Sequence, residues 1–141
     1  MKLSDVKCPF NSDTGTLAFT GVLGAAHAAA MIISPKTVMD KLNEDPNLKE
    51  TQHANMRMAG AMAGAAAVTA IALSQKDDMA AARRMALAAQ GVTMMGVGVI
   101  QGIETHKERN KKTLGWITTA VHGGVGAVCL YRGLKEGGAA K

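Results

Sequence analysis

Four long blocks without a charged residue limit what this chain can fold into more than any other feature of the sequence. They are Leu17–Ile33, Met58–Ser74, Met85–Ile103 and Leu114–Tyr131, each 17 to 19 residues long. A helix needs roughly 20 apolar residues, and at least about 17, to cross a hydrocarbon core about 30 Å thick. The blocks therefore predict four membrane-spanning helices in a single membrane domain over residues 1–141.

A soluble four-helix bundle is the alternative fold for the same four blocks. Helices of soluble bundles carry a charged or polar stripe at 3.6-residue spacing, which these blocks lack. Glycine inside a soluble helix costs about 1 kcal/mol relative to alanine, yet the third block contains four glycines. In membranes, small residues let helices approach closely. The sequence thus predicts an all-α membrane bundle, with the two GxxxG pairs Gly60/Gly64 and Gly98/Gly102 at helix contacts.

The connection between the first two spans has room for a further element. Ser34 and Pro35 are typical of a helix start, and the segment KTVMDKL that follows has its apolar residues on one side. Asp45-Pro46 would end this helix. We expect a short amphipathic helix, either flat on the membrane surface or solvated within the loop.

The charge of the chain excludes one class of partner. Sixteen basic and eleven acidic residues give a net charge of +5, and only four residues are aromatic. A nucleic-acid-binding protein would gather its basic residues on one face and interleave aromatic residues for stacking. Here the basic residues lie in short loops, eight on each side of four spans, so we expect no nucleic-acid partner. The positive-inside rule assigns no orientation to such a tie.

His27 and His122 stand out because an ionisable side chain inside a span is costly and marks a site by default. In antiparallel first and fourth spans they lie about 15 Å and about 13.5 Å from the same membrane face. Small residues flank both and leave room for a flat macrocycle. The imidazoles are therefore candidate axial ligands of haem iron or of chlorophyll magnesium. Alternatively, each imidazole hydrogen-bonds a neighbouring helix, and the small residues serve close packing.

No motif of a soluble enzyme is present. CxxC, HExxH, Walker and GxSxG sequences are absent, and no Asp or Glu lies inside a block. A carboxylate proton relay of the kind that pumps use thus has no candidate residue. The sequence predicts no catalytic residue and a protein that is not an enzyme.

Short sequence features at the span ends carry a family resemblance. The first span ends at Pro35, an Asn55/Arg57 pair opens the second, and Arg83-Arg84 opens the third. In these features the chain resembles the small DoxX-like four-helix membrane proteins over most of its length. That group largely lacks a defined activity, so the resemblance implies a four-helix membrane bundle.

The composition of the spans suggests what surrounds them. Alanine and glycine insert into a membrane weakly compared with leucine, isoleucine, phenylalanine and valine, and the blocks contain few of the latter. We expect a non-catalytic accessory subunit of a large energy-converting complex, photosynthetic or respiratory, in a thylakoid or mitochondrial inner membrane. Other membrane subunits and lipids would be its partners, and chlorophyll or haem b its candidate cofactors. The alternatives are a small b-type cytochrome with His27 and His122 as haem ligands, and a small-solute carrier.

Overall fold

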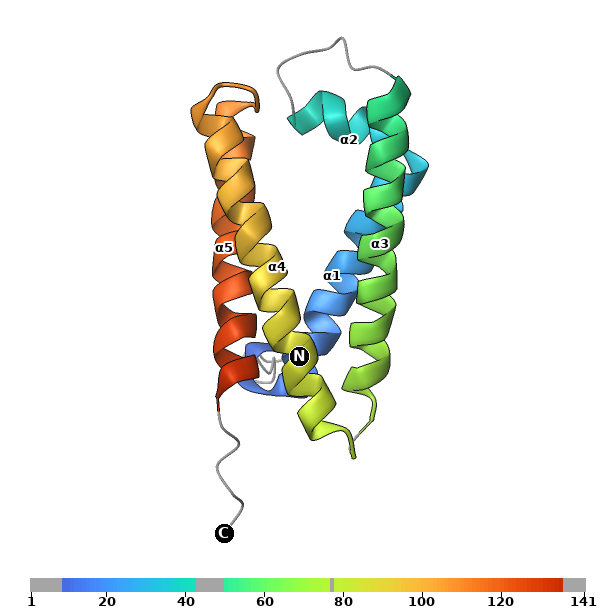
Figure 1. The fold of residues 1–141 in the computed structure, drawn as a ribbon, viewed down its shortest axis with the longest axis vertical. Helices are drawn as coiled ribbons and strands as arrows, with labels where there is room; N and C mark the ends of the chain where they lie inside the picture. The colour runs from blue at the N-terminus through green and yellow to red at the C-terminus, as the bar shows by residue number, and fades with distance from the viewer. Residues whose placement is uncertain (1–8, 43–49, 77, 136–141) are drawn as a thin grey trace, which may run out of the picture.

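The computed structural model describes residues 9–42, 50–76 and 78–135, and within these ranges the chain is all-α. Its four long helices are α1 (Asp13–Ile33), α3 (Glu50–Ser74), α4 (Ala80–His106) and α5 (Lys112–Leu134). The short helix α2 (Pro35–Leu42) lies across one end of the long helices (Figure 1), and a 3-10 turn, η2 (Pro9–Asn11), precedes α1. The predicted all-α, four-helix arrangement and the short helix after the first span are confirmed. Asp45-Pro46, the predicted end of that helix, lies outside the described residues.

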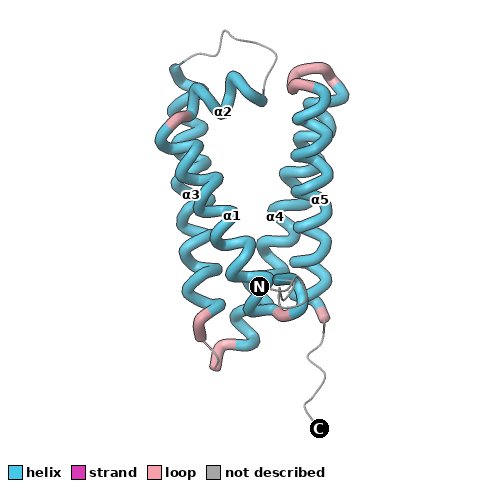
Figure 2. The backbone as a smooth tube through the Cα atoms, turned by 180° about the vertical axis from the view of Figure 1, so that it is seen from behind, coloured by secondary structure: helices cyan, strands magenta, loops and turns pink. Residues whose placement is uncertain are grey.

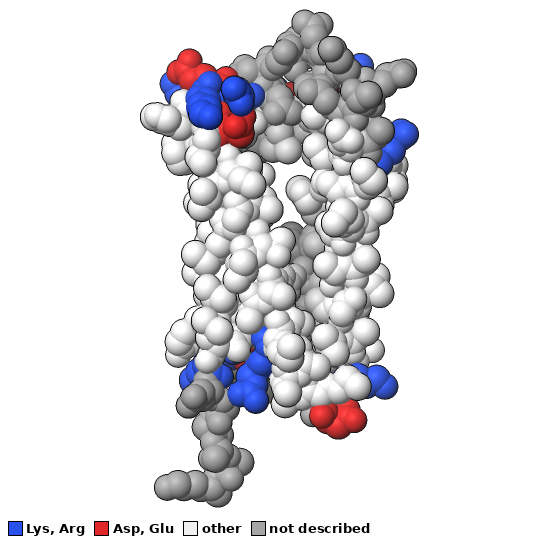
Figure 3. All heavy atoms as spheres, viewed as in Figure 1, with Lys and Arg blue, Asp and Glu red and all other residues white. Residues whose placement is uncertain are grey.

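Each long helix contains a segment that is long and apolar enough to cross a membrane. Charged side chains lie at the two ends of the molecule, and the middle of the face in Figure 3 is free of them. The helices continue past the charge-free blocks; α3 begins at Glu50 and α4 at Ala80. This architecture, apolar in the middle and charged at both ends, is that of an integral membrane protein.

Local side-chain bonds let polar residues remain inside these apolar helices. Ser12 caps the start of α1, where its side chain accepts a hydrogen bond from the Gly15 N–H at 3.0 Å, and Asp13 favourably meets the helix dipole. Within the spans, threonine hydroxyls donate to the backbone carbonyl one turn earlier, as Thr69 does to Ala65 at 2.9 Å and Thr119 to Gly115 at 2.8 Å. Such bonds satisfy the hydroxyl without water.

The four long helices form two antiparallel hairpins. α1 packs along α3, and α4 packs along α5, whereas the two hairpins make few contacts with each other. Figure 2 shows the two pairs diverging toward the end that carries α2. The space between the pairs is a hollow on the face drawn in Figure 3. We call this space the inter-hairpin window.

At the end opposite α2, an apolar cluster joins the hairpins. It takes one buried residue from each long helix: Leu17, Ala70, Leu87 and Cys129. Because this cluster and its neighbours are the main apolar contact between the pairs, the hairpins are closest there.

Polar contacts join the hairpins at both ends. Next to the apolar cluster, Arg132 of α5 forms an ion pair with Asp13 at the start of α1, with 3.2 Å between Nη1 and Oδ1. At the other end, the Lys111 N–H donates to the Leu42 carbonyl at 3.0 Å, and its Nζ donates to the Asp40 carbonyl at 2.8 Å. The inter-hairpin window is thus bounded along the membrane normal by these two joints.

Candidate functional site

His27 of α1 and His122 of α5 lie next to each other across the inter-hairpin window. Their ring centroids are 6.3 Å apart, with an angle of 74° between the ring planes. His27 is seven residues after Thr20, and His122 is seven residues before Cys129, so each lies two turns along the helix face that meets the other hairpin. The structure therefore brings together the two histidines that the sequence places at similar depth.

The backbone of α5 fixes the tautomer of His122. Nδ1 of His122 lies 2.8 Å from the Thr118 carbonyl oxygen, and a carbonyl oxygen can only accept a hydrogen bond. Nδ1 therefore carries the proton, and the lone pair of a neutral ring is on Nε2. Metal-ligating histidines have this arrangement, in which the second ring nitrogen donates to a backbone carbonyl or carboxylate.

The separation of the two ring centroids can be compared with that of two imidazoles bound to one metal ion. A ring nitrogen lies about 1 Å from the imidazole centre, so rings 6.3 Å apart keep their nearest nitrogens at least about 4 Å from each other, too far for a hydrogen bond. Two imidazole nitrogens that each lie about 2 Å from one metal ion place their ring centres about 6 Å apart. The centroid distance therefore matches that of two imidazoles on opposite sides of one metal ion and is too long for a direct hydrogen bond.

Polar side chains also join α1 and α4 between the apolar cluster and the histidine pair. Thr20, which lies between Leu17 and His27 on α1, is in hydrogen-bond contact with Gln90 of α4, with 3.0 Å between Oγ1 and Oε1. Gln101 is eleven residues after Gln90, about three turns, and so on the same side of α4. Its Oε1 is buried and accepts no hydrogen bond from any described residue.

The chemistry of the pair favours a metal that brings most of its own ligands. Among the described residues, no group of three or more His, Cys, Asp or Glu side chains could hold a bare metal ion. A tetrapyrrole supplies four nitrogens to its metal and needs only one or two axial ligands from protein, for which imidazole is suited. Two residues after His122, a side chain at Gly124 would meet no atom within 4 Å, so this part of α5 leaves space for a flat ring.

The four glycines predicted at helix contacts lie against the partner helix of their own hairpin. An added Cβ on Gly60 would lie 3.1 Å from the Ala28 carbonyl oxygen of α1, and one on Gly64 would lie 3.5 Å from the Ala28 Cβ. On α4, a Cβ on Gly98 would lie 3.2 Å from the Gly123 nitrogen, and one on Gly102 would lie 3.4 Å from the Thr119 Cγ2. All four positions therefore face a helix neighbour.

Tighter contacts with backbone atoms of the partner helix occur at glycines outside the GxxxG pairs. A Cβ on Gly91 would lie 2.5 Å from the Leu130 nitrogen, and one on Gly126 would lie 2.9 Å from the Met95 nitrogen. At the end of α5, a Cβ on Gly133 would lie 2.4 Å from the Ala88 nitrogen. The signal that could have identified them is a heptad-like spacing of small residues, since Gly91 and Gly98, like Gly126 and Gly133, are seven residues apart.

Comparison with family models, with curated proteins and with solved structures finds no match to this chain. The resemblance to DoxX-like proteins therefore stays a prediction, and the site is interpreted from its own geometry.

Proposed function

We propose that this chain is a non-catalytic accessory subunit of a larger energy-converting membrane complex, and that it holds a tetrapyrrole between its two helical hairpins. The observation that carries the proposal is the His27–His122 pair, with ring centroids 6.3 Å apart inside the membrane-spanning region. The complex would be photosynthetic or respiratory, in a thylakoid or mitochondrial inner membrane.

The exposure of His27 supports a bound group. In this chain His27 is exposed and His122 is half-buried, although both lie well inside spans. An imidazole that faces lipid at this depth is costly, and such residues normally face a bundle interior, a polar partner or a ligand. A tetrapyrrole in the inter-hairpin window would cover His27 and use its nitrogen.

Each residue of the window would have a distinct role toward such a group. His27 and His122 would hold its metal, the Thr118 carbonyl would keep the His122 ring in orientation, and Gly124 would leave space for the ring edge. When bound, haem would supply one-electron transfer and chlorophyll would supply light absorption. The protein itself would position the tetrapyrrole and exclude water from it.

The weak internal burial of the spans supports the role as a subunit. Within the most apolar window of each span, only 17% to 28% of the residues are buried inside the chain. On α3 the exposed surface includes alanines such as Ala61, Ala65 and Ala66 beside large side chains such as Met62, and small residues favour close helix contacts in membranes. Neighbouring subunits would cover this surface better than lipid would.

An absorption spectrum of the protein purified from its native membrane tests the tetrapyrrole. We expect a Soret band or chlorophyll bands that are lost, or reduced by at least about tenfold, in His27→Ala and in His122→Ala, since removal of one of two ligands weakens binding by at least 10- to 100-fold. His106→Ala is the matched control, because His106 lies at the exposed end of α4 and the bands should persist. A colourless wild-type protein from its native membrane contradicts the cofactor.

The same preparation tests the subunit role. On a native gel the pigmented chain should migrate with larger membrane polypeptides. A second candidate function, a small b-type cytochrome that works alone, is favoured by the pairing of His27 with His122. It predicts one haem per chain in a stable free monomer with a low-spin spectrum, and this outcome contradicts the subunit role while leaving the histidine site intact.

A further inference from the structure

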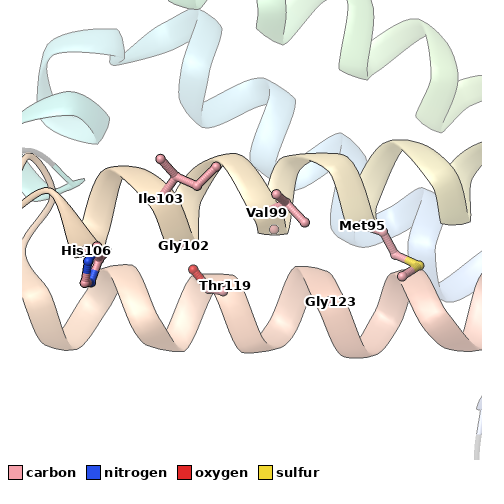
Figure 4. A pocket seen from close by; sticks show the side chains of 8 residues that line it. Met95, Val99, Gly102, Ile103, His106, Thr119 and Gly123 are labelled. Carbon is pink, nitrogen blue, oxygen red and sulfur yellow. The ribbon is translucent and has the colours of Figure 1, made fainter.

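A shallow apolar groove runs along the α4–α5 hairpin and does not involve the histidine pair. It encloses about 450 Å³ and is lined by residues of both helices, including Val99, Ile103, His106 and Thr119. In Figure 4, Met95 marks one end and His106 the other, and the Thr119 side chain points from α5 toward α4 between them.

Glycines create this groove, and larger apolar side chains border it. Gly98, Gly102 and Gly123 provide no side chain to fill the space between the two backbones, whereas Val99 and Ile103 are exposed beside it. Met95 to His106 is eleven residues, or about 16 Å of helix. This length is close to one leaflet of a hydrocarbon core about 30 Å thick.

The shape and the lining of the groove indicate its occupant. The groove is shallow and open along one side, and it has a volume of about 450 Å³ over about 16 Å of helix. Apart from Thr119 and His106, its lining residues are apolar or glycine. A single hydrocarbon chain suits a long groove with this lining.

The membrane-surface end of the groove carries excess positive charge. Four basic and two acidic side chains lie between residues 104 and 112, which leaves +2. Arg109 pairs with Glu104 at 3.1 Å and Lys112 pairs with Glu108 at 3.0 Å. Lys107 is exposed beside His106. This charge complements an anionic headgroup at the end of the groove.

We propose that the groove binds one acyl chain of an anionic phospholipid, whose phosphate lies at the His106–Lys107 end. The chain would run from His106 toward Met95 within one leaflet. This site is independent of the tetrapyrrole, because no residue that lines the groove is one of the paired histidines.

Trp116, the only tryptophan of the chain, reports on this groove. A Cβ on Gly102 would lie 3.9 Å from the Trp116 Cζ3, so the indole borders the site. In phosphatidylcholine vesicles, we expect acyl-brominated phosphatidylglycerol to quench Trp116 fluorescence about twofold more than brominated phosphatidylcholine at the same mole fraction, because the basic end concentrates the anionic lipid locally.

Matched glycine variants separate the groove from general lipid contact. Gly102→Leu fills the groove, and its Cβ would lie 3.4 Å from Thr119 Cγ2, an ordinary contact. Because the acyl chain then has no space, the excess quenching by phosphatidylglycerol should disappear. Gly96→Leu adds the same side chain where a Cβ meets no atom within 4 Å, and the excess should persist. Lys107→Glu tests the headgroup without filling the groove and should also remove the excess, even if Gly102→Leu does not fold. Equal quenching by both lipids in the wild type, or an excess that survives Lys107→Glu, overturns the proposal.

Discussion

At the scale of single residues, glycine determines how closely α4 and α5 approach. Gly91 is buried, and a Cβ there would lie 2.5 Å from the Leu130 nitrogen and 2.8 Å from the Gly126 carbonyl oxygen. Backbone atoms cannot move aside as a flexible side chain can. We expect Gly91→Ala to lower the free energy of unfolding by about 1–3 kcal/mol, the usual cost of overpacking. Denaturation in mixed detergent micelles, followed by circular dichroism, measures this loss.

Gly96 provides the control on the same helix. It is exposed, and a Cβ there meets no atom within 4 Å. Gly96→Ala should leave stability unchanged or raise it by up to about 1 kcal/mol, since alanine favours the helix over glycine. If both variants lose the same stability, the α4–α5 contact does not depend on the missing side chain of Gly91.

The sequence indicated that small residues pack helices, but only in part which ones. A GxxxG search finds Gly98 and Gly102, whose added Cβ atoms would make contacts of 3.2 Å and 3.4 Å. Gly91 and Gly126 approach the opposite backbone more closely, yet no second glycine four residues away marks them. The register of two antiparallel helices decides which glycines meet, and that register is set by all contacts of the hairpin together.

At the scale of elements, charge-free blocks predict the spans better than they predict the helix ends. All four blocks lie within helices, but α3 begins at Glu50, eight residues before Met58. Charged side chains stop the hydrophobic pattern without stopping the helix, because they can reach the headgroup region while the backbone bonds continue. The short helix α2 was predictable because Ser34-Pro35 supplies a local start signal.

The contact between α2 and the start of α5 is the element-scale feature that holds one end of the window together. Lys111 has φ of −56°, which proline can adopt, and its N–H donates to the Leu42 carbonyl. Lys111→Pro should therefore remove this bond while retaining the backbone angle. Loss of a hydrogen bond worth about 1 kcal/mol shifts the population toward separated hairpins about fivefold.

Spin labels on exposed Thr37 of α2 and Arg109 of the α4–α5 loop measure this separation. The labels are attached to cysteines introduced at these two positions in a Cys8→Ser background, so that Cys8 is not labelled. The distribution of distances between the two spin labels should be longer and broader in Lys111→Pro than in the protein with Lys111. Lys111→Ala is the control, because it loses the Nζ contact with Asp40 but keeps the backbone donor. A distribution unchanged in Lys111→Pro means that α2 does not bridge the hairpins.

At the scale of the whole molecule, the sequence predicted the depth of the two histidines in the membrane but not that they face each other. Counting residues along the first and fourth spans places His27 and His122 at similar depth. Their meeting at 6.3 Å also requires that α1 and α5 turn these faces toward each other across the window. That orientation depends on the apolar cluster of Leu17, Ala70, Leu87 and Cys129, which draws one residue from each of the four helices and has no local sequence signature.

The arrangement of the four spans predicts which loops share a side of the membrane. The Asp13–Arg132 ion pair brings the start of α1 and the end of α5 to the same end of the molecule, and the α3–α4 connection around Lys76 lies at that end as well (Figure 1). Single cysteines at Lys76 and Lys135 should therefore react with a membrane-impermeant maleimide from one side of sealed vesicles, and a cysteine at Arg109 only from the other. Cys8→Ser provides the background, and buried Cys129 should stay unlabelled. Labelling of positions 76 and 109 from the same side is incompatible with α4 as a span, because one crossing separates them.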